Sequence, residues 1–483
     1  MAGDSKDVAR AHLADAGVEE LPDDWDVVTL GDLFTEDRGI AVGVMYPGDH
    51  DPDGVPLIKA GDLNGSIINP HPDFRISKDK HHEYRRTALE GGELLMTLVG
   101  NVGQCAVVPP RMAGWNTARA VAVMRLVDSS ETHFVQQCLL SRPLQHLMDV
   151  WCNTTVQATL NLKEIRQLPL PWPPKQSRDA IAAFGKALDD KIELNRRMNA
   201  TLEAMARALF QSWFVDFDPV RAKLDGRAPF PLPVGEGQGE GASGLPAALD
   251  PATAALFPEH LEDSPFGHIP KGWEVCSLAN KIELLSGGTP KTTEPDYWDG
   301  DIPWYSVKDA PSDTDVWVIQ TEKQVTKLGI ENSAAQVMPE GTTIISARGT
   351  VGKLALVGTP MAMNQSCYGV RGVKGYADYF TYFALRQATA DLQQRTHGTV
   401  FDTITRQTFE TLDCIFPPAP LTQAFDRTAA PMLAQIRANL HQSRTLATLR
   451  DTLLPKLLSG ELSVAGGNSP EFPDSSNRDK TKP

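Results

Sequence analysis

The chain of 483 residues is long enough for several domains, and its hydrophobic content of 41% and charged content of 22% are those of an ordinary globular protein. No run of about 18 apolar residues is present, which argues against a transmembrane helix. The first 20 residues lack the apolar segment of a secretory signal. A formal net charge of −15 opposes nucleic-acid binding, but residues 71–210 and 341–460 are net positive, so one basic side remains compatible with DNA.

Six cysteines are scattered at positions 105, 138, 152, 276, 367 and 414, and they form no CxxC or Cys/His cluster. We therefore expect reduced thiols, no zinc or other metal site, and a cytoplasmic protein.

In chain order, residues 1–20 are expected to be an N-terminal extension. Residues 21–174 contain β-rich apolar runs, such as 103–108 and 121–126, separated by Gly, Pro, Asn and Asp. The segment HFVQQCLLSRPLQHLM is typical of a helix. Together these patterns predict a first mixed domain of strands and short helices.

Residues 175–219 predict one long helix. Ile181, Leu188, Leu202 and Leu209 recur at sevenfold spacing, and Asn195 lies in the same register. About 39 helical residues would span roughly 58 Å, which is too long for the apolar seam to be buried by one compact domain. We therefore expect a partner helix.

The next segment, residues 220–268, is expected to be a linker. Its middle, PFPLPVGEGQGEGASGLPAALDPAT, is rich in Pro and Gly and should be flexible. At the end of the chain, residues 463–483 are expected to be a disordered tail.

The second half of the chain repeats the first at offsets of 244 to 249 residues. PDDWDVVTL returns as PKGWEVCSL, VPLIKAGDL as IPWYSVKDA, GELLMTLVGNVG as GTTIISARGTVG, NTTVQATL as HGTVFDTI, and PWPP as IFPP. Asn116 aligns with Asn364, and Asn195 with Asn439. Chance similarity between two amphipathic helices would not keep all these blocks in order, so we predict a second domain at 269–418 and a second long helix at 419–462.

No catalytic arrangement stands out. The segment GTVGK lacks the spacing of a phosphate-binding loop, and HEYRR offers no HExxH, so a surface turn is the simpler interpretation. A GxGxxG motif and a compact nuclease-like cluster of acidic residues and lysine are also absent. These observations favour a non-catalytic binding protein.

With these features in place, the sequence resembles the specificity subunits of type I restriction–modification enzymes. The resemblance rests on the duplicated PxxWxVxxL openings, each followed by GNVG or GTVG, and on the Pro-rich turns that enter the long helices. It rests most on LEAMARALFQSWFVDFDPVRAKLDG and TAALFPEHLEDSPFGHIPKGWEV. The sequence departs from the family at Lys175–Gln176 and Leu421–Thr422, where Glu-Gln is often found, and GEGQGEGASG looks inserted.

The resemblance implies an α+β fold, in which two pseudo-twofold-related α/β target-recognition domains are joined by two long antiparallel, coiled-coil-like helices. It implies that each repeat reads half of a bipartite duplex DNA target and that the helices dock two modification (methyltransferase) subunits. Restriction subunits, which translocate and cleave DNA, would join them in host defence. S-adenosylmethionine, ATP and Mg are then expected on the partner subunits for adenine methylation and DNA cleavage, with no cofactor or catalytic residue in this chain.

Base edges are read by Arg, Lys, Asn and Gln side chains, and such residues recur in or near the repeated blocks. Any one of them could equally be a solvated or turn-forming group. Gly100, Gly103, Gly349 and Gly352 are expected to shape loops, and Trp25 and Trp273 to anchor the core. The DNA-binding candidates are Lys59, Asn101, Asn116, Arg119, Lys308, Arg348, Thr350, Lys353, Asn364 and Gln365.

Asn195 and Asn439 lie at matching midpoints of the two predicted helices. If the helices are antiparallel, these residues meet at the crossing point, where paired amides would fix the register of the spacer. The alternative is that both amides point to solvent.

Two other functions remain open. A two-module protein–protein scaffold without DNA contact is favoured by the acidity, and salt-dependent binding to duplex DNA would discriminate against it. A self-sufficient methyltransferase is disfavoured because the sequence lacks a cofactor loop and an NPPY-like motif.

Overall fold

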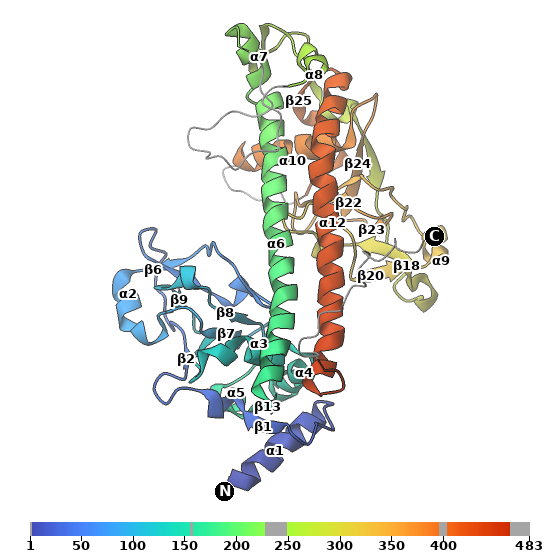
Figure 1. Ribbon diagram of the computed structural model, residues 1–483. Helices are drawn as coiled ribbons and strands as arrows, with labels where there is room; N and C mark the ends of the chain where they lie inside the picture. The colour runs from blue at the N-terminus through green and yellow to red at the C-terminus, as the bar shows by residue number, and fades with distance from the viewer. Residues whose placement is uncertain (1, 155–157, 228–248, 396–402, 464–483) are drawn as a thin grey trace, which may run out of the picture. The chain divides into compact units, whose positions relative to one another are not determined.

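The computed structural model describes residues 2–154, 158–227, 249–395 and 403–463 (Figure 1). The chain divides into two compact units, residues 1–193 with 444–483 and residues 194–443, and each is considered by itself. The Gly-rich middle of the expected linker and nearly all of the expected tail lie outside the described residues, as do parts of the blocks NTTVQATL and HGTVFDTI.

The first unit is built on a four-stranded antiparallel sheet whose residues alternate between two hydrophobic cores. Leu94, Met96 and Met124 belong to one core, whereas Leu95 and Val123 belong to the other. Because both faces are covered, β10 is apolar throughout and β7 is apolar up to its last residue, the buried Thr97. The sheet order is β2 (Ile40–Val42), β10 (Val121–Met124), β7 (Leu94–Thr97) and β8 (Cys105–Val107).

Smaller sheets complete this domain. They pair β1 (Asp26–Thr29) with β13 (Pro169–Trp172), place β3 (Val55–Ile58) between β6 (Arg75–Ile76) and β9 (Asn116–Thr117), and form the hairpins β4 (Leu63–Asn64) with β5 (Ile67–Ile68) and β11 (Asn153–Thr154) with β12 (Ala158–Thr159). The domain's short helices are α2 (Lys78–Glu83), α3 (Thr132–Leu140), α4 (Arg142–Trp151) and α5 (Leu162–Gln167).

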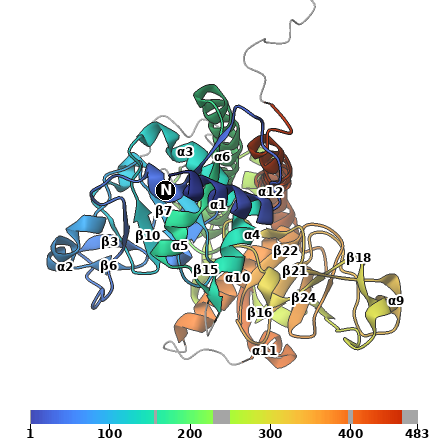
Figure 2. The same ribbon diagram turned by 90° about the horizontal axis from the view of Figure 1, so that it is seen from below.

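Residues 1–20, which the sequence presents as an extension, include helix α1 (Ala2–Asp15). Ala9 and Leu13 are buried in the core of the first unit. His12 meets Trp151 of α4 edge to face, with ring centroids 4.9 Å apart, and α1 lies beside α4 in this unit (Figure 2). The segment is therefore part of the folded unit.

The second unit repeats this plan with one strand more. Its main sheet has the order β17 (Ile282–Ser286), β24 (Cys367–Gly372), β21 (Thr343–Ser346), β22 (Leu354–Val357) and β19 (Trp317–Val318). The smaller sheets are β16 (Glu274–Ser277) with β25 (Asp413–Phe416), β18 (Trp298–Tyr305) between β20 (Lys323–Val325) and β23 (Ala362–Met363), and the hairpin β14 (Leu261–Ser264) with β15 (Gly267–Pro270). The short helices are α7 (Asp218–Leu224), α8 (Pro251–Ala255), α9 (Lys327–Glu331), α10 (Asp378–Arg395) and α11 (Arg406–Thr411).

The duplication of a mixed domain is confirmed, but one alignment of residues is wrong. Strand β9 pairs Asn116 with Leu57, whereas the matching strand β23 pairs Ala362 with Trp304. Leu57 and Trp304 are equivalent, because each lies two residues before the N-cap of a short 3₁₀ helix closed by an aspartate, η2 (Ala60–Asp62) or η8 (Val307–Asp309). Ala362, and not Asn364, is therefore the counterpart of Asn116.

The two long helices are α6 (Lys175–Phe214) and α12 (Ala419–Leu458). Helix α6 stops before the expected end at residue 219, because Phe217 has a left-handed φ of 56° and Pro219 sits at the start of α7.

In each unit, segments of these helices pack antiparallel (Figure 1). In the second unit, Asn199 meets Asn439 while Asn195 meets Ser443. In the first unit, Asp189 of α6 forms an ion pair with Arg450 of α12 at 2.6 Å. Across the described part of the chain, no helix combines the length and the apolar character needed to cross a membrane.

Candidate nucleic-acid interface

One hairpin recurs in both domains with the same hydrogen bonds between a side-chain hydroxyl and the backbone. In the first domain, the Thr97 hydroxyl donates to the Asn101 carbonyl at 2.5 Å and accepts from the Gln104 N–H at 3.0 Å. In the second domain, the Ser346 hydroxyl donates to the Thr350 carbonyl and accepts from the Lys353 N–H at 2.8 Å. A hydroxyl at the end of the incoming strand therefore closes both loops.

The glycines of this hairpin are required by its backbone. Gly100 and Gly349 have φ values of 81° and 79°, and Gly103 and Gly352 both have 84°. Glycine adopts these left-handed angles without the steric cost that other residues incur. The expectation that these four residues shape a loop agrees with this geometry.

In the second domain, the hairpin borders a hollow of about 560 Å³ that brings four of the predicted residues together. Three cationic side chains and one carboxylate line it, which makes it suited to a polyanion. The lining is Trp304, Ser306, Val307, Lys308, Glu322, Lys323, Arg348, Gly349, Thr350, Asn364 and Ser366.

Two of these cations are unpaired. Within the described residues, Lys308 and Arg348 are exposed and form no hydrogen bond or ion pair through their side chains. The Lys323 ammonium lies 5.5 Å from the centre of the Trp298 ring. The side chains of Lys308 and Arg348 can therefore bind a ligand without first breaking a hydrogen bond or ion pair within the described residues.

The other two candidates of the second domain lie beside the hollow rather than in its lining. Lys353 is half-exposed and lies 3.7 Å from the Asp313 carboxylate. Gln365 is exposed and accepts a hydrogen bond from the Thr289 hydroxyl.

The first domain places its candidates differently. Lys59 forms an ion pair with Asp73 at 2.8 Å and lies over the Phe74 ring. Arg119 and Asn101 are exposed, and Asn101 accepts a long hydrogen bond from Gln104 at 3.4 Å.

Asn116 has no exposed surface. Its side chain accepts from the Thr87 hydroxyl at 2.8 Å and donates to the Tyr84 carbonyl at 3.2 Å, and it also meets His81. Burial also lowers the pKa of His81, with a smaller contribution from the neighbouring His82. The Asn116 amide therefore holds the segment that follows α2. Because it is buried and already hydrogen-bonded, it is not accessible to a base edge in this structure.

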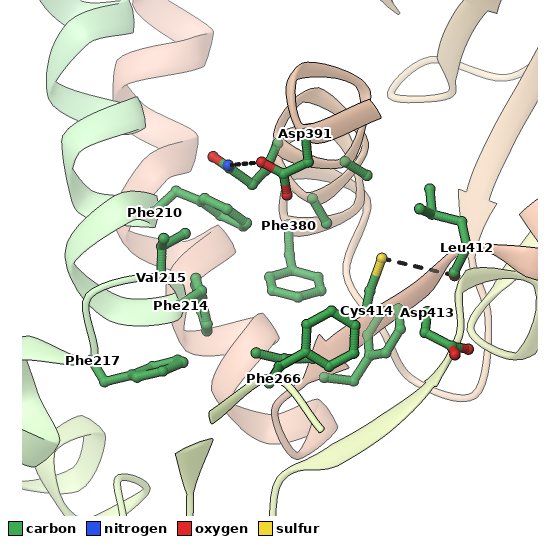
Figure 3. Close-up of a pocket in the computed structure, with 15 residues that line it drawn as sticks. Phe210, Phe214, Val215, Phe217, Phe266, Phe380, Asp391, Leu412, Asp413 and Cys414 are labelled. Atoms are coloured by element: carbon green, nitrogen blue, oxygen red, sulfur yellow. Dashed lines mark hydrogen bonds between the residues drawn. The ribbon is translucent and has the colours of Figure 1, made fainter. Parts of the chain in front are cut away.

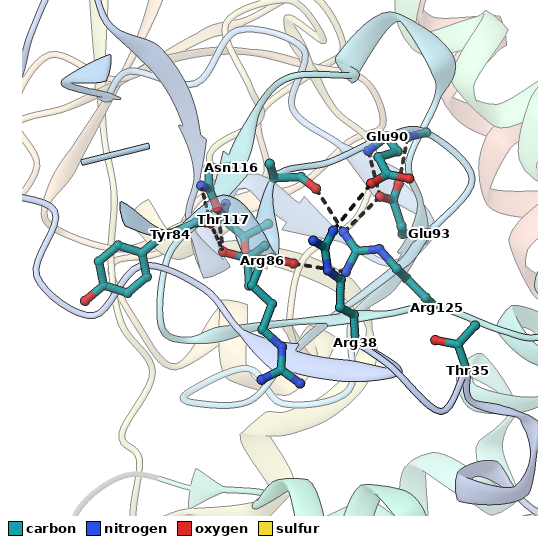
Figure 4. A network of polar contacts seen from close by, with 12 residues as sticks. Thr35, Arg38, Tyr84, Arg86, Glu90, Glu93, Asn116, Thr117 and Arg125 are labelled. Carbon is teal, nitrogen blue, oxygen red and sulfur yellow. Dashed lines mark hydrogen bonds and ion pairs between the residues drawn. The ribbon is translucent and has the colours of Figure 1, made fainter. Parts of the chain in front are cut away.

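The same segment is fixed further on by the partly buried Arg125 (Figure 4). Arg125 donates to the carbonyls of Arg86 and Ala88 and forms an ion pair with Glu93 at 3.3 Å. Glu93 in turn accepts the backbone N–H groups of Glu90 and Gly91, each at 2.7 Å.

This network supports a basic surface that the sequence patterns did not single out. Arg86 points away from the network in Figure 4. Lys78, His82, Arg85 and Arg86 are all exposed, and they outnumber the exposed acidic residues between them, Asp79 and Glu83. The basic residues are visible in the sequence as KDKHHEYRR, but the sequence alone does not distinguish this segment from an ordinary surface turn.

The asparagines of the spacer are buried at the helix crossing in the second unit. The Asn195 amide donates to Gln442 at 2.9 Å and to Ser443 at 3.1 Å, while the Asn439 amide donates to Asn199 at 2.9 Å. The two amide groups therefore do not pair with each other as expected, although the residues do meet, since the Asn195 amide also donates to the Asn439 backbone carbonyl at 3.4 Å. In the register of the two helices, Ser443 lies opposite Asn195 and Asn199 lies opposite Asn439, so each asparagine amide bonds a side chain one turn further along the opposite helix.

A second hollow, of about 300 Å³, is lined mainly by apolar residues, six of which are phenylalanines (Figure 3). It explains the aromatic motif FQSWFVDF, since Phe210, Phe214 and Phe217 form one wall and Phe380 of α10 another. Among its few polar groups, Asp391 accepts a hydrogen bond from Gln387 at 2.9 Å. Among the described residues, no group of three potential metal ligands occurs.

Comparison with known proteins places these features in a family. The model of the type I restriction modification DNA specificity domain matches residues 22–204 and again residues 270–437. A specificity subunit of the type I restriction enzyme HindI from Haemophilus influenzae is 27% identical over 332 residues, which cover 63% of this chain and 71% of the relative. The MjaIX specificity subunit from Methanocaldococcus jannaschii is 23% identical over 457 residues, which cover 92% and 95%.

A solved type I S subunit from M. genitalium aligns with 90% of this chain and 96% of its own, at 15% identity and a TM-score of 0.48. The two family matches fall on the two repeats and together span more than half of the sequence. The resemblance seen in the sequence is thereby confirmed, and the chain belongs to the type I restriction–modification DNA specificity family.

Proposed function

We propose that this chain is the DNA-specificity subunit of a type I restriction–modification enzyme, in which each repeat reads one half of a bipartite duplex target. The observation that carries the proposal is the repeated hairpin, whose tip borders a cationic hollow in the second domain. Two similar reading domains suit a split target, because half-site spacing follows the spacing of the protein modules.

The side chains suggest how the second half-site is read. Arg348 has a free guanidinium at the hairpin tip, and such a fork can donate two hydrogen bonds to the O6 and N7 atoms of guanine. Lys308 and Lys323 supply positive charge for phosphate groups, which position the protein without reading sequence. Asn364 and Thr350 add shorter polar groups that reach base edges or phosphates.

In the first domain, Asn101, Gln104 and Arg119 are the corresponding polar groups, and Arg85 and Arg86 supply cationic surface. Amide side chains pair with the N6 and N7 atoms of adenine. The two halves of the target are therefore expected to differ in sequence.

In this proposal, methylation, translocation and cleavage of DNA are carried out by partner subunits. The long helices dock two modification subunits, which bring S-adenosylmethionine, and restriction subunits bring ATP- and Mg-dependent translocation and cleavage. This chain acts without catalytic residues of its own, in the cytoplasm. Support for this part of the proposal comes from family membership and from the two 40-residue helices.

The test is DNA binding by the chain assembled with its modification subunits. Methylation mapping of the host genome should give a bipartite motif, and duplexes carrying that motif should bind with an affinity that falls steeply with salt. Arg348→Ala should weaken binding, whereas Lys327→Ala, which removes an exposed lysine outside the hollow, should not. Absence of salt-dependent binding to duplex DNA would favour the two-module scaffold instead.

A further inference from the structure

The turn Asp315–Val316–Trp317 in the second unit is strained. Val316 has a φ of 61° and is 1% exposed, although β-branched residues rarely adopt left-handed angles. The Trp317 N–H donates to the Asp315 carbonyl at 2.5 Å, which closes a three-residue turn of the rarer, strained form. Such a conformation persists only where the surrounding structure holds it, and it often marks a functional device.

Both long helices hold this turn within the second unit. Asp315 accepts a hydrogen bond from the Asn199 amide of α6 at 3.2 Å. The Trp317 indole donates to the Leu433 carbonyl of α12 at 2.8 Å. Trp317 is only 2% exposed. The Arg437 guanidinium covers the same ring at 5.3 Å from its centre.

The attachment point on α6 belongs to the polar crossing of the spacer. Asn199 also accepts the hydrogen bond from Asn439, and both side chains are buried. Because buried amides tolerate few alternative partners, a shift of one helix past the other would disturb Asn199 and, through it, Asp315.

On its other side, the turn leads to the reading hairpin. Trp317 begins β19, which pairs in parallel with β22, the strand that leaves the hairpin. Asp313, two residues before Asp315, lies 3.7 Å from Lys353 at the base of the hairpin tip. In the part of the chain that is described, the first domain's main sheet ends at β8 and has no strand equivalent to β19.

We propose that the turn Asp315–Trp317 is a positioning device that fixes the second reading hairpin against the helix crossing. It thereby sets the number of base pairs between the two half-sites, here called the gap length, at which the second domain can bind its half-site. Asp315 and Trp317 are positioning residues that do not touch DNA. This inference rests on the proposed function, since it assigns to one turn the coupling between spacer register and target reading.

The experiment uses the full chain assembled with its modification subunits. Duplexes carry the two half-sites found by methylation mapping, separated by the native gap or by a gap one base pair longer or shorter. The quantity measured is the ratio of methylation rates at the native and altered gaps. Asp315→Ala removes the acceptor for Asn199 and, with it, the acceptor for the Ser312 hydroxyl. Trp317→Phe removes the indole donor but keeps an aromatic ring.

We expect each variant to lose the preference for the native gap by roughly five- to tenfold, the effect of one buried hydrogen bond. Thr314→Ala is the matched control, because Thr314 lies in the same loop and, among the described residues, its hydroxyl meets Ser312 and leaves the hydrogen bond from Ser312 to Asp315 in place. Asp315→Asn, which keeps an acceptor oxygen, should retain the preference.

The outcomes separate the two proposals. Folded Asp315→Ala and Trp317→Phe proteins that keep the native preference would overturn the positioning role, as would an equal loss of methylation at every gap. Loss of preference in Asp315→Asn would overturn the hydrogen-bond route. If the unaltered chain shows no preference for a bipartite duplex at all, the proposed function itself fails.

Discussion

The two reading domains share a hairpin backbone but differ in the charge that the hairpin presents. A hydroxyl, Thr97 or Ser346, closes both loops with the same hydrogen bonds. Yet Arg348 of the second domain stands where the first domain has Val99, and Lys353 stands where it has Gln104. Duplication has therefore retained the groups that build the loop and varied the groups at its tip, as expected of two modules that read different sequences.

The domains also differ in how they are fastened to the long helices. In the first unit, Gln137 of α3 donates to Asp189 of α6 at 3.1 Å, and Gly185 leaves room for that glutamine. In the second unit, Arg386 of α10 forms an ion pair with the buried Glu203 of α6. The second unit adds the strained turn at Val316, so its hairpin is connected to the spacer by a route that the first domain's sheet does not show.

Exchange of one domain should produce the largest effect. If residues 20–170 are replaced by the equivalent segment of another family member, the half-site read by the first domain should change completely while the other half stays the same. Methylation mapping of cells that express the chimera measures this directly. Changes in both halves would show that the two domains do not read independently.

A core substitution should separate the stabilities of the two units. Trp213 is fully buried in the second unit, edge to face with Phe257 and Phe425. Trp213→Ala should reduce the free energy of unfolding of this unit by about 3–5 kcal/mol, because it leaves a large cavity. Hydrogen exchange should report faster opening in residues 194–443 only, and matched acceleration in β7 and β10 of the first unit would contradict this.

The charge difference at the hairpins predicts a smaller, reciprocal effect on DNA binding. Arg348→Ala should weaken binding by about 1–3 kcal/mol and relax specificity at one position of one half-site. Val99→Arg in the first hairpin should add salt-dependent affinity without altering the second half-site. Fluorescence anisotropy across a salt series measures both, and an unchanged affinity for Arg348→Ala would place this side chain outside the interface.

The smallest expected effect concerns the helix crossing. Asn199→Leu and Asn439→Leu should each destabilise the second unit, and the double variant should recover part of the loss. The coupling energy between them should be about 1 kcal/mol, as for a buried hydrogen bond. Urea unfolding of the four proteins in this cycle gives that value, and additive losses would show that the two amides act separately.

Local sequence patterns determined a large share of this architecture. The repeat, the two long helices, the glycine-shaped hairpins and the aromatic motif are recorded in spacing and composition, because backbone angles and helical periodicity are local properties. The repeated blocks also contain Lys308, Arg348, Thr350 and Asn364, but it is the folded chain that brings these residues together around one hollow.

Other features were decided only by the tertiary structure. Asn116 and Asn364 align in sequence, but one is buried beneath α2 and the other borders a hollow, because strand pairing set their register two residues apart. Lys323 lines the hollow because the neighbouring strand β20 places it there. The partners of Asn195 and Asn439 depend on where two helices more than 200 residues apart in sequence cross, and Val316 is strained because contacts on both sides hold it. Burial and pairing between distant segments are properties of the packed chain, and no local pattern encodes them.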